Sequence, residues 1–461
     1  MEDSGKVPWG YQWRSSPFFI IGTVCVALFI EIFLYGFLVP ILPYMLENRL
    51  HVDPSQTQRF TSISLALHGL MSAFGGPLIG HFADKAADRR TPLLVALVGC
   101  IIGTAMVACG TSLVVFFTGR VLQGISGSGA WIVGLATAAD TVGQDRVGTI
   151  MGIIMSFVNA GMIVGPMVSG LILETAGYWL TWTVPVVILI IDIVARLLMI
   201  EIPRDTTSKA TDDAAETDSL LSQADTPTKE SLAPNFWRIM LGNSRVITVL
   251  LITIWGPCLG TTLNATLPLY VQETFGWGPS RTGLLFFLIA APGLLISALA
   301  GWLRDRIGTR LPATTALIFQ GGCLVLLGFA GNVHFKWSSA ENRGQALYIS
   351  AIIILGMVRP FLSGIGPVEL TSIVKIKEEQ SPGVFGPRGG YSRVFSIVEV
   401  AATTGMTIGP LISGCLVERF GYAMMNWSFS LSSVLFAVLA FIFLGSKKVN
   451  KGKSKLDSAD E

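Results

Sequence analysis

Four ionisable side chains stand inside long apolar stretches of this chain, and their types could do chemistry. Glu31 and Glu399 carry carboxylates, and Arg120 and Arg359 carry guanidinium groups. A charge in a hydrocarbon layer costs at least about 2.5 kcal/mol, so such groups mark pathways for ions or polar solutes. A carboxylate in that setting can load and unload a proton. We therefore interpret Glu31 and Glu399 as candidate proton-coupling groups.

Each of these charges also has a structural alternative. Either glutamate can form a fixed ion pair, for which Arg359 is an available partner. Arg120 can join neighbouring helices by hydrogen bonds, and it needs some partner because of the cost of burying its charge. His68 could line the same cavity, or it could be a packed histidine with its hydrogen bonds satisfied.

The composition places these charges in a membrane protein. Of the 461 residues, 51% are hydrophobic and only 13% are charged, whereas soluble domains carry about 25% charged residues. A net charge of +2 gives no field that would attract nucleic acid. The six cysteines are scattered without ligand spacing, and no nucleophile elbow or nucleotide loop is present. We therefore expect no metal, no cofactor and no enzyme activity.

The elements that must position the charges are membrane-spanning helices. A hydrocarbon core about 30 Å thick requires about 20 mostly apolar residues per helix. Twelve runs satisfy this requirement: 18–42, 60–82, 93–113, 115–138, 149–173, 180–200, 246–271, 283–303, 311–330, 346–373, 391–417 and 423–444. Near the end of the sixth run, Asp192 and Arg196 are four residues apart, which favours a local ion pair.

The chain also repeats itself. Gly165-Pro166 and Ser169-Gly170 recur as Gly409-Pro410 and Ser413-Gly414, and Pro54-Ser55 recurs as Pro279-Ser280. Two related hydrophobic halves are typical of secondary transporters, whose substrate site lies between the halves. We expect an all-α integral membrane protein in which twelve transmembrane helices form two pseudo-symmetric six-helix bundles, residues 18–200 and 246–444. Residues 1–17, 201–245 and 445–461 are predicted to be an N-terminal segment, a disordered linker and a C-terminal tail.

Lysine and arginine residues predict the orientation. Six of the 32 fall on one side of the predicted spans, namely Arg49, Arg59, Arg281, Lys336, Arg343 and Arg419. Three lie within spans, namely Arg120, Arg196 and Arg359, which leaves 23 for the other side. Positive residues concentrate on the cytosolic side, so both termini are predicted to be cytosolic. Within the linker, residues 216–221 resemble an acidic dileucine sorting signal.

Three motifs resemble those of the major facilitator superfamily. The first is its cytosolic loop motif, a conformational latch in the family, which occurs once in each half. Its residues here are Gly80, Asp84, Arg89 and Arg90 in the first copy, and Gly301, Asp305, Arg306 and Arg310 in the second. The first copy departs from the family pattern, because Ala87 replaces the usual glycine and Asp88 comes before Arg89.

The second motif is Arg120-Val121-Leu122-Gln123-Gly124, whose arginine has been proposed in the family to assist proton movement. The third is similar to the glycine–proline motif of the antiporter branch. It consists of Gly161, Gly165 and Pro166, with a second copy at Gly409-Pro410. Glycines four residues apart allow close packing of helices, and Pro166 bends its helix.

The surroundings of Glu31 and Glu399 resemble those of vesicular amine transporters and their drug-exporting relatives, where acids at the matching positions bind protons or the cationic substrate. Two positions differ from that pattern: Asn264 and Arg359 stand where the amine transporters carry acids. The resemblance implies a cavity that includes Glu31, Glu399, Arg359, Asn264 and Arg120. With Arg359 present, that cavity suits zwitterions, organic acids or neutral metabolites better than a simple amine.

The resemblance as a whole implies the twelve-span drug:proton antiporter branch, and the sequence near the N-terminus is similar to that of fungal members of this branch. We therefore expect proton-coupled export of a small organic compound (a drug, toxin or secondary metabolite) by a monomer. The expected site of action is the plasma membrane, with a vacuolar or endosomal membrane as the alternative. Two other functions fit the same pattern: import of a nutrient or metabolite, and a non-transporting membrane sensor with the same fold.

Overall fold

The computed structural model describes residues 9–85, 90–142, 147–200, 236–332, 338–339, 343–381, 384 and 391–445, and these residues form helices without strands. In chain order the helices are α1 (Tyr11–Arg14), α2 (Pro17–Tyr44), η1 (Met45–Arg49), α3 (Pro54–Lys85), α4 (Arg90–Cys109), α5 (Leu113–Val142), α6 (Val147–Leu198), α7 (Phe236–Leu241), α8 (Ser244–Phe275), α9 (Pro279–Ile307), α10 (Arg310–Phe329), α11 (Gly344–Leu362), α12 (Ile365–Gln380) and α13 (Tyr391–Phe443).

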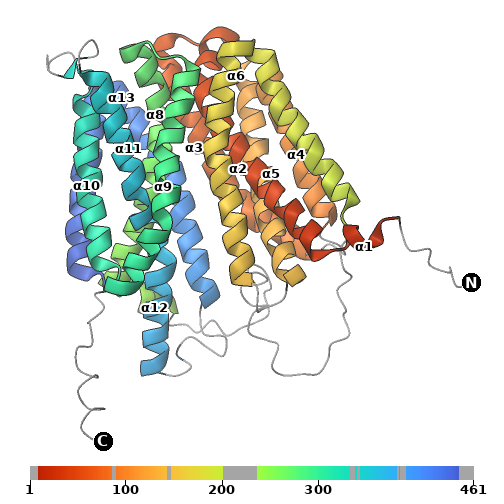
Figure 1. Cartoon of the computed structure of the whole chain (residues 1–461), viewed down its shortest axis with the longest axis vertical. Coiled ribbons are helices and arrows are strands. Elements are labelled where there is room, and N and C mark those ends of the chain that lie inside the picture. Colours follow the sequence, from red (N-terminus) through yellow and green to blue (C-terminus); the bar gives the residue numbers. More distant parts are fainter. Residues whose placement is uncertain are drawn as a thin grey trace, which may run out of the picture.

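Two of these helices each cross the bundle twice. α6 and α13 contain Gly177 and Gly421, whose φ angles of 79° and 80° are non-helical. Positive φ favours glycine, and each glycine separates two helices that meet at a kink. Both α6 and α13 turn back on themselves at one end of the bundle (Figure 1). In the described residues, seven helical segments are long and apolar enough to cross a membrane. With α6 and α13 divided at their glycines, and α3, α4 and α5 running beside them, the arrangement is consistent with twelve spans.

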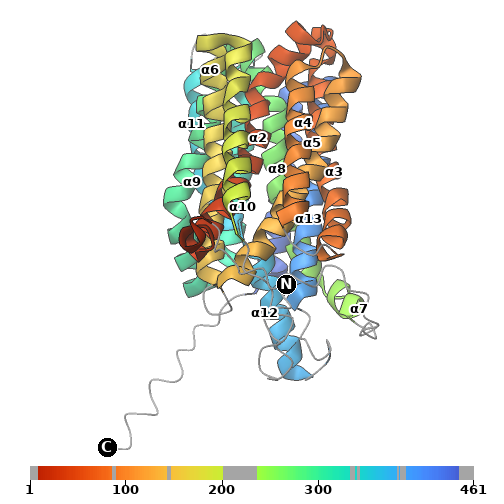
Figure 2. The same cartoon turned by 90° about the vertical axis from the view of Figure 1, so that its right-hand side faces the viewer.

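The bundle has two ends. α1, α7 and α12 lie at one end, which we call the inner face (Figures 1 and 2). The turns within α6 and α13, together with η1, lie at the opposite end, which we call the outer face. Large apolar side chains such as Val187, Ile191, Leu431 and Leu435 are exposed on the sides of the bundle, as lipid-facing residues are.

The glycines of the repeated motif hold the first and fifth spans of each half together. These are α2 and the first part of α6 in the first half, and α8 and the first part of α13 in the second. At each of four glycines, an added Cβ would press on a backbone carbonyl of the facing helix, so the two backbones meet directly. The pairs are Gly161 with Phe29, Gly165 with Phe33, Gly405 with Ile254 and Gly409 with Cys258. The contacts of the second half thus repeat those of the first at equivalent positions, as the sequence repeat does. The duplication is therefore a duplication of packing.

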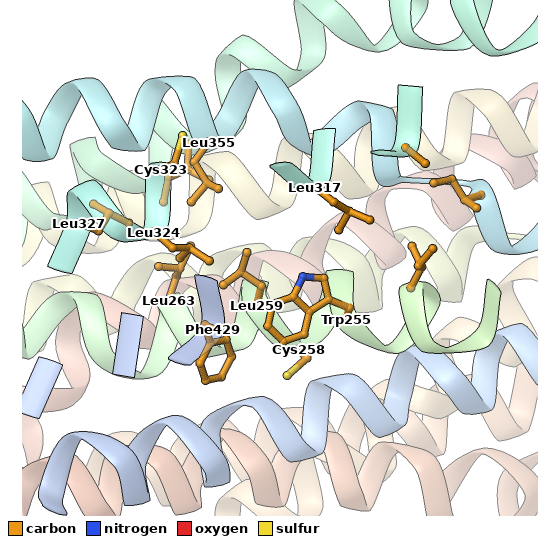
Figure 3. Close-up of a cluster of buried hydrophobic side chains, with 14 of the residues drawn as sticks. Trp255, Cys258, Leu259, Leu263, Leu317, Cys323, Leu324, Leu327, Leu355 and Phe429 are labelled. Carbon is orange, nitrogen blue, oxygen red and sulfur yellow. The ribbon is translucent and has the colours of Figure 1, made fainter. Parts of the chain in front are cut away.

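The core of the second half is apolar. Trp255, Leu259 and Leu263 of α8 point toward Leu317 and Leu324 of α10 (Figure 3). These side chains are buried. The same cluster reaches Leu355 of α11 and Phe429 of α13.

The two halves touch near the outer face. The Gln58 side chain of α3 donates from Nε2 to the carbonyl of Ala265 in α8 at 3.0 Å. Gly414 of α13 packs against Ser62 of α3, and Gly283 of α9 packs against the Pro166 carbonyl of α6. These contacts bring α3 and α6 of the first half against α8, α9 and α13 of the second.

Some sequence predictions lie outside the described residues. These are the disorder of the linker over residues 201–235, the sorting-like signal at 216–221, and the ends 1–8 and 446–461. The boundaries of the segments as we divided them remain predictions.

Candidate functional site

A polar cluster lies in the interior of the first half, around Glu31. The carboxylate Oε1 of Glu31 in α2 is 3.8 Å from Nε2 of His68 in α3. Arg120 of α5 is 1% exposed, and its charge attracts that of Glu31 across the space between them. Three helices of one bundle thus bring an acid, a base and a cation together, and all three residues line the same internal pocket.

Hydrogen bonds fix one edge of this cluster. The guanidinium NH1 of Arg120 donates to Oε1 of Gln123 at 2.9 Å, and Nε2 of Gln123 donates to the Thr104 hydroxyl of α4 at 3.0 Å. The other edge is unsatisfied, because Nε and NH2 of Arg120 and Nδ1 of His68 have no hydrogen-bond partner among the described residues. Buried polar groups are normally paired, so this cluster can change its hydrogen bonds when a proton arrives or leaves.

The absence of a side chain at Gly127 makes room for the Glu31 carboxylate. A Cβ added at Gly127 in α5 would overlap the carboxylate group of Glu31. The acid is therefore pressed against the backbone of α5, one turn from Gly124, whose own Cβ would meet the His68 backbone. Neither glycine is among the predicted site residues, although both stand in a stretch rich in glycine and serine at the end of the arginine motif.

The cluster reaches the boundary between the halves through Tyr35. The Tyr35 ring lies 5.2 Å from the His68 ring, measured between centroids. Its buried hydroxyl lies near the side chain of Asn264 in α8. Asn264, one of the predicted site residues, thus belongs to the same region as Glu31, and it belongs to the other half.

Arg359 lies in the second half, beside Gly260. A Cβ added at Gly260 of α8 would lie 3.1 Å from NH2 of Arg359 in α11, so the missing side chain makes room for the guanidinium. Arg359 is half-buried. In the described residues, no ion pair joins it to Glu31 or Glu399; Glu31 lies beside His68 instead. The alternative of a fixed pair with Arg359 thus finds no support in the geometry.

Glu399 is exposed near the beginning of α13. The Thr403 hydroxyl donates a hydrogen bond to the Glu399 backbone carbonyl, and this contact leaves the carboxylate uninvolved. Glu399 therefore differs from Glu31, which lies within a packed cluster.

The loop-motif residues lie where α3 meets α4 and where α9 meets α10, at the inner face. In the described part they are Gly80 and Asp84 in α3, Arg90 at the start of α4, Gly301, Asp305 and Arg306 in α9, and Arg310 at the start of α10. Arg89 lies outside the described residues. Arg310 places its guanidinium 4.3 Å from the Phe441 ring centroid of α13, and Arg304 donates to the Ser363 carbonyl at the end of α11.

Sequence reasoning missed a second buried charge. Glu369 of α12 is 4% exposed and accepts hydrogen bonds from Arg245 of α8 and from the Thr309 hydroxyl. This cluster lies at the inner face, away from Glu31. The predicted Asp192–Arg196 ion pair is confirmed, with Oδ2 and Nε 3.1 Å apart.

Comparisons with known proteins identify the family of the chain. Residues 24–373 match the model of the Major Facilitator Superfamily. An uncharacterized MFS-type transporter of Schizosaccharomyces pombe is 34% identical over 426 residues, which cover 90% of this chain and 92% of that protein. The MFS-type transporter ppzB of Metarhizium rileyi is 29% identical over 96% of this chain and 98% of its own.

More distant proteins share the same framework. The class B tetracycline resistance protein of Escherichia coli is 25% identical over 73% of this chain and 77% of its own. The crystal structure of the nucleoside transporter NupG superposes with a TM-score of 0.66 at 14% identity, covering 91% of this chain and 98% of that one. At that identity the structural likeness shows the fold alone. Family match, relatives and fold agree: the chain belongs to the major facilitator superfamily and is a multi-pass membrane transporter of that type.

Proposed function

We propose that this transporter exports a small organic compound from the cytosol in exchange for protons. The observation that carries the proposal is the Glu31 carboxylate, held 3.8 Å from His68 and within the field of the Arg120 guanidinium in the interior of the first half. A carboxylate among these groups can hold a proton or release it without large movement.

The contacts at the outer face support a mechanism in which the bundle opens alternately to its two ends. Gln58 reaches Ala265 across the halves, and Gly283 meets the Pro166 carbonyl. Both contacts close the bundle on the outer side. We propose that this state faces the cytosol through the inner face, with both termini on that side, and that the halves rock about the Glu31 region to open the outer face.

Three observations support export and a substrate other than a simple amine cation. The glycine–proline packing of Gly161, Gly165 and Pro166 resembles the antiporter pattern, and one distant relative is a tetracycline resistance protein. The Arg359 guanidinium beside Gly260 has no carboxylate partner in the described residues. An unpaired cation within a membrane-spanning segment attracts an anionic group, so the proposed substrate carries an acidic or zwitterionic group.

Comparative metabolomics of the native host would identify the compound. Strains that lack the protein, overproduce it, or overproduce the Glu31→Gln form would be compared in cells and medium. We expect a compound that accumulates inside the deletion strain and outside the overproducer, with the Glu31→Gln strain resembling the deletion. Depletion of that compound from the medium by the overproducer would instead establish import.

Purified protein in liposomes would then test the coupling. With a pH gradient and the identified compound, wild type should concentrate the compound against its gradient, and Glu31→Gln should lose this by about 100-fold or more. The variant should retain compound-for-compound exchange, which needs no net proton movement. Glu418→Gln, a change at an exposed glutamate of α13, is the control. Full gradient-driven transport by Glu31→Gln would contradict the proposal.

A further inference from the structure

Two helices that correspond in the repeat begin in different ways at the outer face. α3 begins with Asp53-Pro54-Ser55, and its counterpart α9 begins with Gly278-Pro279-Ser280. The first N–H groups of a helix lack partners within the helix, so a side chain before it usually caps them. The second copy keeps the proline and the serine but has glycine in place of the capping aspartate.

The first-half helix is capped by its own aspartate. The Ser55 N–H donates to Oδ1 of Asp53 at 2.8 Å, and the Ser55 hydroxyl donates to the same oxygen at 2.5 Å. These two hydrogen bonds hold the pKa of the Asp53 carboxyl below its usual value. α3 therefore starts without help from the other half.

The second-half helix is capped from the other half. Gly278 supplies no side-chain cap, and the Ser280 N–H donates to Oε2 of Glu174 at 3.0 Å. Glu174 belongs to α6 of the first half, one turn before Gly177. A Cβ added at Gly278 would lie 3.0 Å from the same carboxylate oxygen, so the glycine leaves space for this capping group.

Close backbone packing holds the two helices in register at this point. A Cβ added at Gly170 of α6 would press on the Pro279 carbonyl, and one at Gly283 of α9 would press on the Pro166 carbonyl. Glu174 lies one turn beyond Gly170, so it faces the start of α9. A negative charge there also meets the positive end of the α9 helix dipole.

We infer that Glu174 is a positioning residue that holds the outer face closed by capping α9 across the two halves. The inference rests on the alternating access of the proposed function: when the outer face opens, α9 moves away from α6 and the cap is lost. The cap exists only in the closed state, so the capping energy shifts the balance between the two states toward closure. The repeat counterpart of Glu174 is Glu418, whose partner helix α3 already has Asp53.

Three variants separate latching from simple capping. Glu174→Ala removes the cap from the other half. Glu174→Ala with Gly278→Asp restores a cap within the second half, in the manner of Asp53, without restoring the contact between halves; the φ of −73° at Gly278 suits aspartate. Glu418→Ala removes the counterpart acid and serves as the matched control.

Spin labels on two native cysteines would report the opening of the outer face. Cys109 at the end of α4 and Cys415 in α13 are exposed and lie in opposite halves, whereas the other four cysteines are buried. The distance distribution between the labels would be measured by pulsed EPR on the purified full chain, without substrate. We expect Glu174→Ala to raise the ratio of long-distance to short-distance molecules about two- to fivefold. The double variant should stay raised, and Glu418→Ala should match wild type.

Each other outcome has a definite meaning. An unchanged ratio in Glu174→Ala, or a return to the wild-type ratio when Gly278→Asp is added, would overturn the latch. A single distance in wild type over the whole range of pH and in every variant would overturn alternating access and the latch with it. A shifted ratio in Glu174→Ala together with full gradient-driven transport by Glu31→Gln would leave the latch standing while the proton-coupling proposal fails.

Discussion

The two halves place very different side chains at corresponding positions of their first helices. The register that pairs Phe29 with Ile254 in the repeated glycine packing also aligns Glu31 with Gly256 and Tyr35 with Gly260. In the first half these positions supply the acid and the ring beside His68. In the second half, Gly256 has no neighbour within 4 Å of an added Cβ, and Gly260 makes room for Arg359.

The buried charges differ in depth as well. The first half concentrates Glu31, His68 and Arg120 within the span region, whereas the second half has an apolar core there (Figure 3). Its buried acid, Glu369, lies at the inner face and ties α12 to Arg245. Duplication thus preserved the glycine packing that joins helices and left the polar residues free to diverge. We propose that the first half handles the proton and the second provides Arg359 for the substrate.

The largest expected effect comes from neutralising Glu369, the buried acid at the inner face of the second half. Glu369→Gln leaves Arg245 without its charge partner, and losing one member of a buried pair costs about 3 kcal/mol. Since Arg245 is partly exposed, the measured loss should be at the low end. Hydrogen exchange should accelerate in α8 and α12 and stay unchanged in α2 and α5.

Glu379→Gln is the matched control for that change, because Glu379 is an exposed glutamate of the same helix α12. It should exchange like wild type. If hydrogen exchange became faster throughout both halves of the Glu369→Gln protein, the two bundles would not be separately stabilised.

A pair of glycine substitutions tests the comparison at the site. Gly127→Ala adds a methyl group where the Glu31 carboxylate lies, and overpacking of this kind costs about 1–3 kcal/mol. Gradient-driven transport in liposomes should fall about 10- to 100-fold. Gly256→Ala adds a methyl group at the counterpart of Glu31, where nothing lies within 4 Å, and should stay within about twofold of wild type. Equal losses of transport in Gly127→Ala and Gly256→Ala would contradict the proposed difference between the two halves.

Arg359→Gln tests the assignment of the substrate to the second half. The change removes a charge without removing the space beside Gly260. For a substrate with an acidic group, KM should rise about tenfold while the maximal rate changes little, as expected for the loss of one charge-assisted contact. Arg359→Lys should recover part of the affinity. An unchanged KM for such a substrate would place its acidic group elsewhere.

The smallest effect concerns the cap of α3 and its pH dependence. The pKa of Asp53 is below its ordinary value of 3.8, so its contribution to stability is complete above that pH. It is lost as the pH falls through the lowered pKa, because protonation weakens the accepted hydrogen bonds. The difference in melting temperature between wild type and Asp53→Ala should therefore shrink below about pH 4. A difference that stays constant down to about pH 2 would contradict this.

The framework could be predicted because backbone packing leaves a mark in the sequence. Gly161 and Gly165 are spaced by one helical turn and recur in the second half, and the structure packs each copy on a carbonyl of the facing helix. The Asp192–Arg196 pair was equally local, since both residues lie on one helix. Patterns of three and four residues carry such information directly.

The site could be predicted only in part because its contacts join distant segments. Glu31 was identified by its charge in an apolar run, but its neighbour His68 comes from another helix, and the proximity of Gly127 depends on how α5 crosses α2. Glu369 was missed although the predicted run 346–373 contains it, because the run is broken at Gly364, whose φ is 77°, and its end forms the separate helix α12. The pairing of Glu369 with Arg245 joins residues 124 positions apart, and no local pattern indicates it.

The first half is closed on itself by one arginine near its beginning. The Arg14 side chain donates to the Leu198 carbonyl at the end of α6, and the Ile200 N–H donates to the Arg14 carbonyl. In the second half, Arg245 likewise lies against Gly445 after α13. Each bundle therefore has a contact of its own that joins its first and last helices. During synthesis on the ribosome, the first bundle can complete its perimeter before α8 has been translated, and the second can then assemble against a finished surface.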